Sequence, residues 1–319
     1  MSFHHVTVLP HELVDAIDPS SGTYYVDVTA GGGGHSALLL SRYPNARLLS
    51  LDRDPRAVAA TRERLATFGD RSIVVNACFD ELSDVLAELQ FGREVAGAFR
   101  VDGVMGDLGV SSPQMDVAER GFAFMHEGPL DMRMGGDGPT AAEWLLSVTD
   151  EELANALSRY GDVPGPMRYA RAIRMDLAAG KIRTTRDLAG LCERLRDRKA
   201  ARQHNPATLV FQAIRIAVND ELGQLERLLK QLPDVLHHGG MAAFISFHSL
   251  EDRLVKHTFA AWTTPPPVPR ELPIRDVLGR TPFVKAGKAV EPSDSEQHEN
   301  PRSRSARMRA VRRNAPERA

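Results

Sequence analysis

The stretch Tyr24-Tyr-Val-Asp-Val-Thr-Ala-Gly-Gly-Gly-Gly-His-Ser36 joins a β-rich run, a glycine cluster and the start of a helical segment. Glycines let the backbone turn sharply at the carboxyl end of a strand, and they let a ligand approach the bare chain. No Gly-Lys-Ser/Thr follows, which excludes a Walker loop, and Ser36 replaces the third glycine of the dinucleotide fingerprint. The stretch predicts a strand–loop–helix unit suited to a nucleoside cofactor.

Strand and helix signals then alternate at the spacing of βαβ units. We expect strands at Arg47–Asp52, Ser72–Asn76 and Val101–Asp107, and helices at His35–Arg42, Pro55–Leu65 and Glu81–Leu89. Parallel strands with crossover helices indicate an α/β fold with a doubly wound sheet. Asp52 ends the second strand, 19 residues beyond Gly33, where a carboxylate can accept hydrogen bonds from both ribose hydroxyls of a nucleoside cofactor.

The alternation stops at residue 113. Residues 113–205 contain a loop rich in Gly, Pro and Met, followed by helical stretches expected at Glu151–Arg159, Met167–Ala179 and Thr185–Arg198. We therefore predict a helical insertion at 113–205 within a discontinuous domain of residues 1–112 and 206–319.

After the insertion, we expect Asn205-Pro206 to open a single long helix that runs past Leu229. Gly239-Gly240 should end that helical stretch. The remaining expected elements are a strand at Met241–Ser246, a helix at Ser249–Trp262, a proline-rich connector at Pro265–Pro273 and a hairpin of Thr281–Lys285 with Ala306–Arg312.

The composition is that of an ordinary soluble protein, with 319 residues, 42% hydrophobic and 26% charged. This balance excludes a fully disordered or fibrous chain. No run of about 20 apolar residues and no signal peptide are visible, so we expect no membrane association. The two cysteines form no Cys-x-x-Cys pair and the histidines lack ligand spacing. We therefore expect no metal, and a cytoplasmic location.

The net charge of −2 is unevenly distributed along the chain. Residues 168–204 carry +7 and residues 302–319 carry +6, which leaves −15 for the rest. Two basic segments on an acidic body favour a polyanionic partner, and solvated helix faces with a frayed tail are the alternative.

Three further residues are site candidates because of their places at predicted strand ends. Phe79 follows the third strand and is suited either to packing on an adenine face or to the core. Asp107 ends the fourth strand, where an unpaired carboxylate is costly, so a functional role is favoured. His248 follows the fifth strand without a Gly-x-Ser-x-Gly elbow, which favours helix capping or substrate contact over a hydrolase triad.

Long stretches of the chain resemble the MraW/RsmH family of bacterial 16S ribosomal RNA cytosine-N4 methyltransferases. The similar stretches are Gly32–Ser36, Leu51–Pro55, Val101–Gln114, Glu119–Phe124, Gly128–Met134, Ala141–Leu145, Phe211–Leu222, Ile245–Arg253 and Asn300–Ser305. The resemblance runs from about His5 to Arg312. It implies a class I (Rossmann-like) methyltransferase domain that uses S-adenosylmethionine, with the inserted helices recognising substrate. The implied substrate is 16S rRNA in the decoding region of the small ribosomal subunit.

The resemblance also implies roles for individual residues. The cofactor contacts fall on Gly33, Gly34, His35, Asp52, Phe79, Asp107 and Gln114. In this chemistry Asp107 and a neighbouring backbone carbonyl are the natural acceptors for a hydrogen of the cytosine amino group, and His248 is a second catalytic candidate. The evenly spaced arginines of the insertion would hold RNA phosphates: Arg168, Arg171 and Arg174.

Two departures from the family pattern surround the insertion. Asn205-Pro-Ala-Thr-Leu209 stands where the family has His-Pro-Ala-Thr-Arg, and Asp162-Val163 stands where Glu-Glu is common. Two other function classes stay open on the residues alone. They are a nicotinamide-dependent oxidoreductase, if the glycine loop is taken by itself, and a non-catalytic RNA-binding or ribosome-assembly factor.

Overall fold

The computed structural model describes residues 7–196, 205–265 and 281–314. These residues fall into two compact units, one formed by Met1–Gly109 with Leu222–Ala319 and the other by Val110–Glu221. The proline-rich connector expected at Pro265–Pro273 lies largely outside the described residues.

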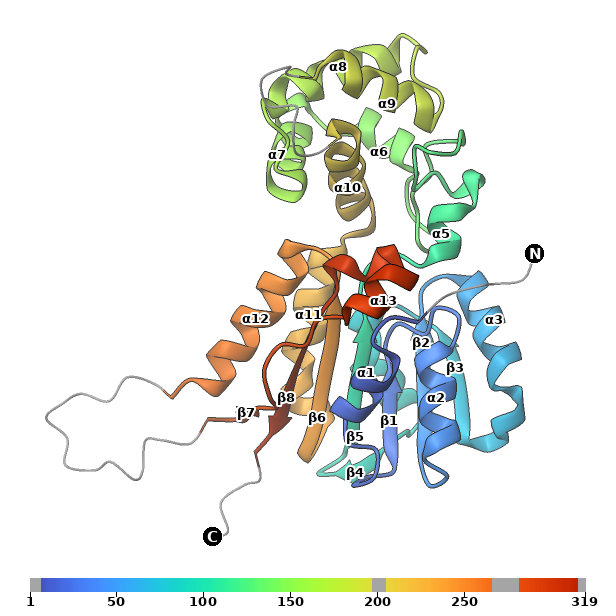
Figure 1. The fold of residues 1–319 in the computed structure, drawn as a ribbon, viewed down its shortest axis with the longest axis vertical. Coiled ribbons are helices and arrows are strands. Elements are labelled where there is room, and N and C mark those ends of the chain that lie inside the picture. Colours follow the sequence, from blue (N-terminus) through green and yellow to red (C-terminus); the bar gives the residue numbers. More distant parts are fainter. Residues whose placement is uncertain (1–6, 197–204, 266–280, 315–319) are drawn as a thin grey trace, which may run out of the picture. The chain divides into compact units, whose positions relative to one another are not determined.

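The first unit is built on an eight-stranded sheet with the strand order β3-β2-β1-β5-β6-β8-β7, and β4 pairs with β5 (Figure 1). The strands are β1 (Tyr24–Asp27), β2 (Arg47–Asp52), β3 (Ser72–Asn76), β4 (Arg93–Val95), β5 (Ala98–Asp107), β6 (Leu236–Ser246), β7 (Phe283–Lys285) and β8 (Arg307–Arg313). Strands β3, β2, β1, β5 and β6 are parallel, whereas β4, β8 and β7 are antiparallel to their neighbours. The order reverses between β1 and β5, and such a switch point is where open α/β sheets bind ligands.

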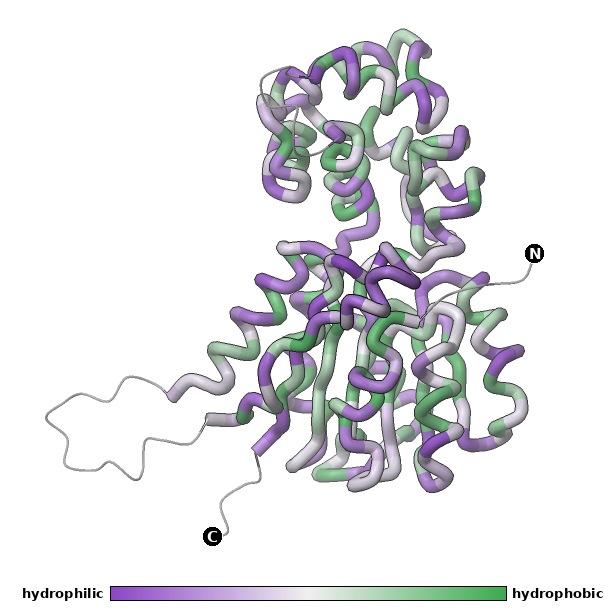
Figure 2. The backbone as a smooth tube through the Cα atoms, viewed as in Figure 1, coloured by the Kyte–Doolittle hydropathy of each residue, from purple (hydrophilic) through white to green (hydrophobic). Residues whose placement is uncertain are grey.

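Helices cover both faces of this sheet because successive side chains of each strand point to opposite faces. The helices of this unit are α1 (Pro10–Ala16), α2 (Gly34–Arg42), α3 (Pro55–Leu65), α4 (Leu82–Glu88), α11 (Glu221–Val235), α12 (Ser249–Thr263) and α13 (Asp294–Glu299), with 3-10 turns η1 (Ala66–Arg71), η2 (Phe79–Glu81) and η4 (Pro301–Ser305). Tyr25 and Leu48 pack with α1, α2 and α3, whereas Val26 and Leu49 pack with α4, α11 and α12. Figure 2 shows hydrophobic stretches in the strands and in the helices that cover them.

The second unit is helical. It contains α5 (Ser112–Asp116), η3 (Ala118–Arg120), α6 (Ala141–Ser147), α7 (Asp150–Gly161), α8 (Pro166–Ala178), α9 (Thr185–Arg194) and α10 (Pro206–Asn219). Thr140, Thr149 and Thr184 begin α6, α7 and α9 with capping boxes, in which each side chain accepts a backbone N–H three residues on. These helices share one apolar core and leave only an isolated bridge, Pro129 with Thr184, as β structure among the described residues of the unit.

Three expectations about the chain after the insertion need correction. The single long helix is two helices, because Asp220 takes a left-handed conformation (φ 49°) that ends α10 before α11 begins at Glu221. Helix α10 belongs with the inserted helices, since its apolar face enters their core through Val210, Phe211 and Ile214.

The third correction concerns Gly239-Gly240, which lies within β6 and not between a helix and a strand. A Cβ atom on Gly240 would lie 2.8 Å from the His237 carbonyl oxygen, so the close backbone approach beside the register shift needs glycine there. The closing hairpin is confirmed, since β7 pairs antiparallel with β8. No helix among the described residues is long and apolar enough to cross a membrane.

Candidate active site

The glycine loop of the first unit makes a tight turn between β1 and α2. Gly33 takes a left-handed conformation (φ 73°) and its N–H donates to the Ala30 carbonyl over 2.7 Å. A Cβ atom on Gly34 would lie 2.0 Å from Oγ1 of Thr7, so no side chain fits at that position. The loop therefore keeps its backbone close to the carboxyl end of the sheet, as the sequence predicts.

Asp52 ties this loop to the end of β2. Its Oδ2 accepts the Gly31 N–H over 2.8 Å, and its Oδ1 accepts the Asp54 N–H over 2.8 Å. Burial raises the pKa of Asp52 from 3.8 to about 6, although both backbone hydrogen bonds oppose that rise. Each carboxylate oxygen offers two acceptor directions, so the group retains capacity for two further donors such as ribose hydroxyls.

Asp107 ends β5 with a carboxyl group that is almost enclosed, at 11% side-chain exposure. Its backbone N–H donates to Oγ1 of Thr29 on the neighbouring strand end. Its Oδ1 is buried and has no hydrogen-bond partner among the described residues. Burial raises the pKa of Asp107 well above its usual value, and the carboxyl groups of Asp27, Glu251 and Glu296 raise it further. A buried acceptor without a donor is costly, which makes this oxygen a candidate for a ligand or substrate contact.

His35 faces this carboxyl group from the first turn of α2. Its Nε2 lies 2.9 Å from the Val8 carbonyl oxygen, which only accepts, so Nε2 carries a hydrogen. Its Nδ1 lies 4.0 Å from Oδ2 of Asp107. The ring is buried, so the hydrogen bond to Val8 fixes its orientation beside Asp107.

Asp27 is a residue that the sequence analysis did not select. It ends β1 between Asp52 and Asp107 and is 2% exposed. Its Oδ2 accepts from the Ser36 hydroxyl over 2.7 Å, and Oδ1 accepts the Thr29 N–H over 3.1 Å. Burial raises the pKa of Asp27 to about 6. The signal that would have found it is the one used for Asp52, an acidic residue at the end of a strand beside the glycine loop.

Phe79 and His248 occupy two further strand ends. Phe79 is half-buried at the start of η2, where it packs against the core of the α4 face. His248 caps α12, since its Nδ1 accepts the Glu251 N–H over 3.4 Å. Its Nε2 lies 3.1 Å from Oε1 of Glu251, which is itself buried. His248 therefore has the capping role, one of the two expected for it, and its catalytic role stays a prediction.

The remaining predicted residues lie in the second unit. Gln114 is buried and closes the capping box of α5, where its Oε1 accepts the Ser111 N–H over 2.9 Å. Arg168 donates to the Leu195 carbonyl. Arg174 pairs with Asp150 over 2.7 Å, whereas Arg171 lies 3.9 Å from the same carboxylate and is 69% exposed. The three arginines thus lie on the same helix, α8, but differ in how closely each side chain is bound to other groups of the chain.

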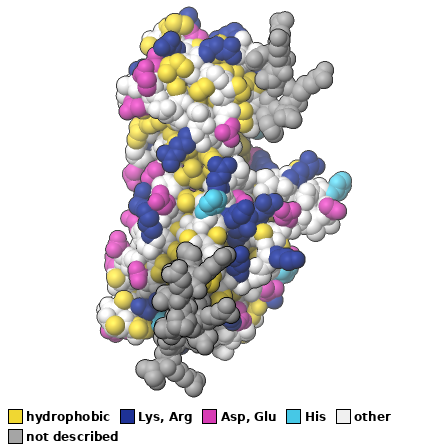
Figure 3. Space-filling view, turned by 90° about the vertical axis from the view of Figure 1, so that its left-hand side faces the viewer, with side chains coloured by type: hydrophobic (Ala, Val, Ile, Leu, Met, Phe, Trp, Pro, Cys, Tyr) yellow, Lys and Arg dark blue, Asp and Glu magenta, His cyan; other side chains and the backbone are white. Residues whose placement is uncertain are grey.

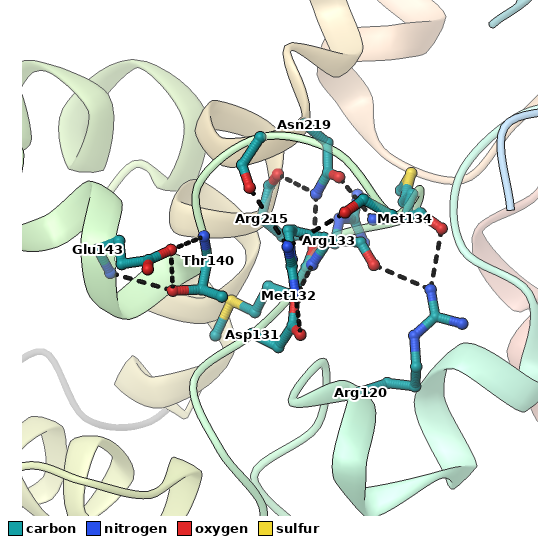
Figure 4. Close-up of polar contacts among 11 residues, drawn as sticks. Arg120, Asp131, Met132, Arg133, Met134, Thr140, Glu143, Arg215 and Asn219 are labelled. Carbon is teal, nitrogen blue, oxygen red and sulfur yellow. Dashed lines mark hydrogen bonds and ion pairs between the residues drawn. The ribbon is translucent and has the colours of Figure 1, made fainter.

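A polar network fixes the loop that follows η3 (Figure 4). Asn219, buried at the end of α10, accepts the Met134 N–H over 2.8 Å and donates to the Met132 carbonyl over 2.7 Å. Arg120 donates to the carbonyls of Arg133 and Met134, each over 2.9 Å. Met132 has a left-handed backbone (φ 57°), a strained conformation that such contacts hold in place.

The chain is similar to known proteins over nearly its whole length. The MraW methylase family model matches residues 2–314. Ribosomal RNA small subunit methyltransferase H from Anaeromyxobacter sp. (strain Fw109-5) is 46% identical over 311 residues, which cover 97% of each chain. Its namesake from Symbiobacterium thermophilum is 44% identical over 316 residues, 98% of this chain and 97% of that one. A solved rRNA methylase from Streptococcus thermophilus aligns with a TM-score of 0.39 at 10% identity, over 96% of this chain and 94% of that one.

Proposed function

The chain belongs to the MraW methylase family, and from that premise we propose that it methylates N4 of a cytosine in 16S rRNA with S-adenosylmethionine as methyl donor. The observation that carries the proposal is the buried Oδ1 of Asp107 at the strand end beside the glycine loop, an atom with no hydrogen-bond partner among the described residues. The relatives named ribosomal RNA small subunit methyltransferase H support the substrate class.

The residues of the first unit fit such a cofactor. Gly33 and Gly34 leave bare backbone at the loop, and Asp52 keeps acceptor capacity for ribose hydroxyls. Phe79 offers a half-buried ring for an adenine face, and His35 is held beside Asp107. Gln114, in the second unit, stays a predicted cofactor contact.

S-adenosylmethionine, when bound, supplies an electrophilic methyl group on a positively charged sulfur. The cytosine amino group is a weak nucleophile because its lone pair is delocalised into the ring. Asp107 would accept a hydrogen of that amino group as the nitrogen takes the methyl group from sulfur, which would leave as a neutral thioether. The amino proton would then pass to Asp107 and on to solvent. Holding the reacting groups in line supplies a large part of the rate enhancement.

Asp107 accepts this hydrogen more strongly when it is ionised, although a neutral carbonyl oxygen at the same place is also an acceptor. Burial and nearby carboxyl groups raise the pKa of Asp107. A positive charge placed beside the group favours its ionised form and lowers the pKa. The positively charged sulfur of S-adenosylmethionine would supply such a charge, and Nδ1 of His35 lies 4.0 Å from Oδ2 of the same group. His248 keeps a supporting role by fixing the start of α12 and the buried carboxyl of Glu251.

The second unit would recognise the RNA. Three arginines lie on α8: Arg168, Arg171 and Arg174. Arg171 and Arg174 both pair with Asp150, and Arg171 is the more exposed of these two. Arginines of this kind position a nucleic acid through its phosphates. An enzyme of ribosomal RNA acts in the cytoplasm, which is the location that we propose.

The proposal is tested by incubating the purified protein with small ribosomal subunits and S-adenosylmethionine that carries a labelled methyl group. Nucleoside analysis of the 16S rRNA should give labelled N4-methylcytidine. Label on another atom would overturn the proposed position, and absence of label would favour a non-catalytic RNA-binding protein. Tight binding of NAD in place of S-adenosylmethionine would favour an oxidoreductase.

A further inference from the structure

The last described stretch of the first unit is strongly basic. Residues 301–313 contain six arginines and no acidic residue. In the structure they form η4 and β8, and β8 is held between β6 and β7. These arginines therefore stand on a folded strand with fixed positions, which a frayed tail would not provide.

The arginines on one face of β8 are linked to α12 through a single carboxylate. Arg309 binds Asp252 through Nε at 2.7 Å and Nη2 at 3.1 Å, and Nη1 of Arg307 lies 3.6 Å from the same group. Arg307 also pairs with Glu291. Burial raises the pKa of Asp252, but Arg309, Arg307 and Lys256 outweigh this effect, and the net pKa lies below the usual value. Three cations thus surround Asp252.

Lys256 and two further cations nearby have exposed side chains. Arg253 and Lys256 lie on α12, and Arg304 lies in η4 just before β8. Neither a hydrogen bond nor an ion pair engages these three side chains within the described part of the chain. We call Arg253, Lys256, Arg304, Arg307 and Arg309 the α12–β8 basic face, and Figure 3 shows Lys and Arg side chains gathered over this side of the molecule.

The register of the sheet places this face beside the candidate active site. Asp107 pairs with Ile245 of β6, and Ile245 pairs with Met308 of β8. Because neighbouring strands lie about 4.8 Å apart, the backbones at Asp107 and Met308 are roughly 10 Å apart. Arg307 and Arg309 flank Met308 on the α12 side. This separation is comparable to the reach from the amino edge of a base to its own backbone phosphate.

We propose that the α12–β8 basic face binds backbone phosphates of the RNA substrate next to the target nucleotide. The inference rests on the proposed function and adds a phosphate-binding surface on the catalytic unit itself, separate from the arginines of α8. Arg307 and Arg309 are held in place by Asp252, so little side-chain freedom is lost when they meet a phosphate. Arg253 and Arg304 lack an acidic partner in the described chain, and Lys256 acts on Asp252 through its charge without forming an ion pair. All three can pair with phosphates directly.

The test uses the full chain with Arg253→Gln and Lys256→Gln combined, which leaves the Asp252 ion pairs in place. The matched control is Arg47→Gln with Lys230→Gln, since both residues are exposed on the same unit. Arg47 begins β2, so it lies at the end of that strand opposite to Asp52. Binding to small ribosomal subunits and to a labelled single-stranded RNA is measured over a range of salt concentrations. Calorimetry with S-adenosylmethionine checks the cofactor site.

Each lost phosphate contact should reduce the slope of log K against log salt by about 0.7 to 0.9, so the double variant should lose about 1.4 to 1.8. The control should keep the wild-type slope, and both should bind S-adenosylmethionine like wild type. A test-variant slope equal to that of the control would overturn the basic-face proposal. If the double variant lowered the salt slope on small ribosomal subunits but not on single-stranded RNA, the basic-face proposal would also be overturned, in favour of a contact with a ribosomal protein. Failure of the proposed function is distinguishable, because wild type would then bind RNA without methylating it.

Discussion

Three aspartates end neighbouring strands of the sheet, and their surroundings differ although their sequence positions are alike. Asp52 accepts two backbone N–H groups and Asp27 accepts from Ser36 and Thr29, whereas Oδ1 of Asp107 has no partner in the described chain. Burial raises the pKa of Asp27 and Asp52 to about 6 and that of Asp107 well above its usual value. The residue with unsatisfied polar capacity is the one best placed for chemistry.

Substitution of Asp107 separates a catalytic role from a structural one. We expect Asp107→Ala to lower single-turnover methyl transfer by about 10²- to 10³-fold, the usual loss for a preorganised polar contact. Asp107→Asn should keep measurable activity because its amide oxygen still accepts a hydrogen. Neither variant should destabilise the fold, since Oδ1 of Asp107 has no hydrogen-bond partner within residues 7–196, 205–265 and 281–314.

The rates should be measured with saturating S-adenosylmethionine, because loss of cofactor binding would otherwise mimic loss of chemistry. Thermal melts verify folding. If a folded Asp107→Ala variant saturated with S-adenosylmethionine reacted at the wild-type rate, Asp107 would have no catalytic role.

Asp27 should make stability depend on pH in a defined direction. Its pKa is about 6 in the folded chain against 3.8 for an ordinary carboxyl. Between these values the folded chain binds more protons than the unfolded chain, so the free energy of unfolding falls as pH rises from about 4 to about 6. A difference of about two pKa units corresponds to a loss of about 3 kcal/mol.

Urea unfolding between pH 4 and pH 7 measures this effect. Asp27→Asn should flatten the decline, and Asp84→Asn, which changes an exposed carboxyl on α4, controls for the substitution itself. An Asp27→Asn variant that loses stability with pH as steeply as wild type would contradict the assignment.

At the scale of elements, the last residue of α10 binds a loop that is distant in the sequence through its buried side-chain amide. Asn219 connects the last turn of α10 to the Met132 and Met134 backbone, 85 or more residues earlier in the chain. Asp220 then takes the left-handed conformation that separates α10 from α11. The short side chains of Asn and Asp tolerate such turns because they hydrogen-bond locally.

Asn219→Ala should destabilise the second unit by about 1 to 3 kcal/mol, because the Met134 N–H and the Met132 carbonyl lose their partner in a buried place. Hydrogen exchange should accelerate in the loop at residues 128–138 and stay at the wild-type rate in the first unit. Unchanged protection of the Met134 amide would show that Arg120 alone is sufficient to fix the loop.

At the scale of the whole molecule, each unit has an apolar core of its own, and basic charge is concentrated in two segments. The net charge of −2 hides +7 in residues 168–204 and +6 in residues 302–319. The structure qualifies the first of these. Arg174 and Arg168 are engaged with Asp150 and the Leu195 carbonyl, whereas Arg171 is 69% exposed.

RNA binding should therefore depend more on Arg171 than on Arg174. We expect Arg171→Gln to reduce the salt slope for small-subunit binding by about 0.7 to 0.9, the value of one phosphate contact. Arg174→Gln should change it less, because Arg174 is 32% exposed and already paired at 2.7 Å. Equal slopes for Arg171→Gln and wild type would indicate that α8 presents a solvated face.

The sequence by itself determined the α/β order, the glycine loop and the strand-end places of Asp52 and Asp107. These features depend on local periodicity and on the backbone freedom of glycine, and both can be recognised within a short segment of sequence. Helix starts such as Asn205-Pro206 were equally local, because a cap and its N–H lie within three residues.

The tertiary structure alone decided which of these groups interact. The Asp107 N–H donates to the hydroxyl of Thr29, which lies 78 residues away in the sequence. The pKa of Asp27 is raised because packing of the sheet buries its carboxyl group. The membership of α10 in the second unit and the pairing of Arg174 with Asp150 likewise depend on packing between separate helices. Contacts through space between distant residues leave no periodic signal along the chain, so the folded chain was needed to show them.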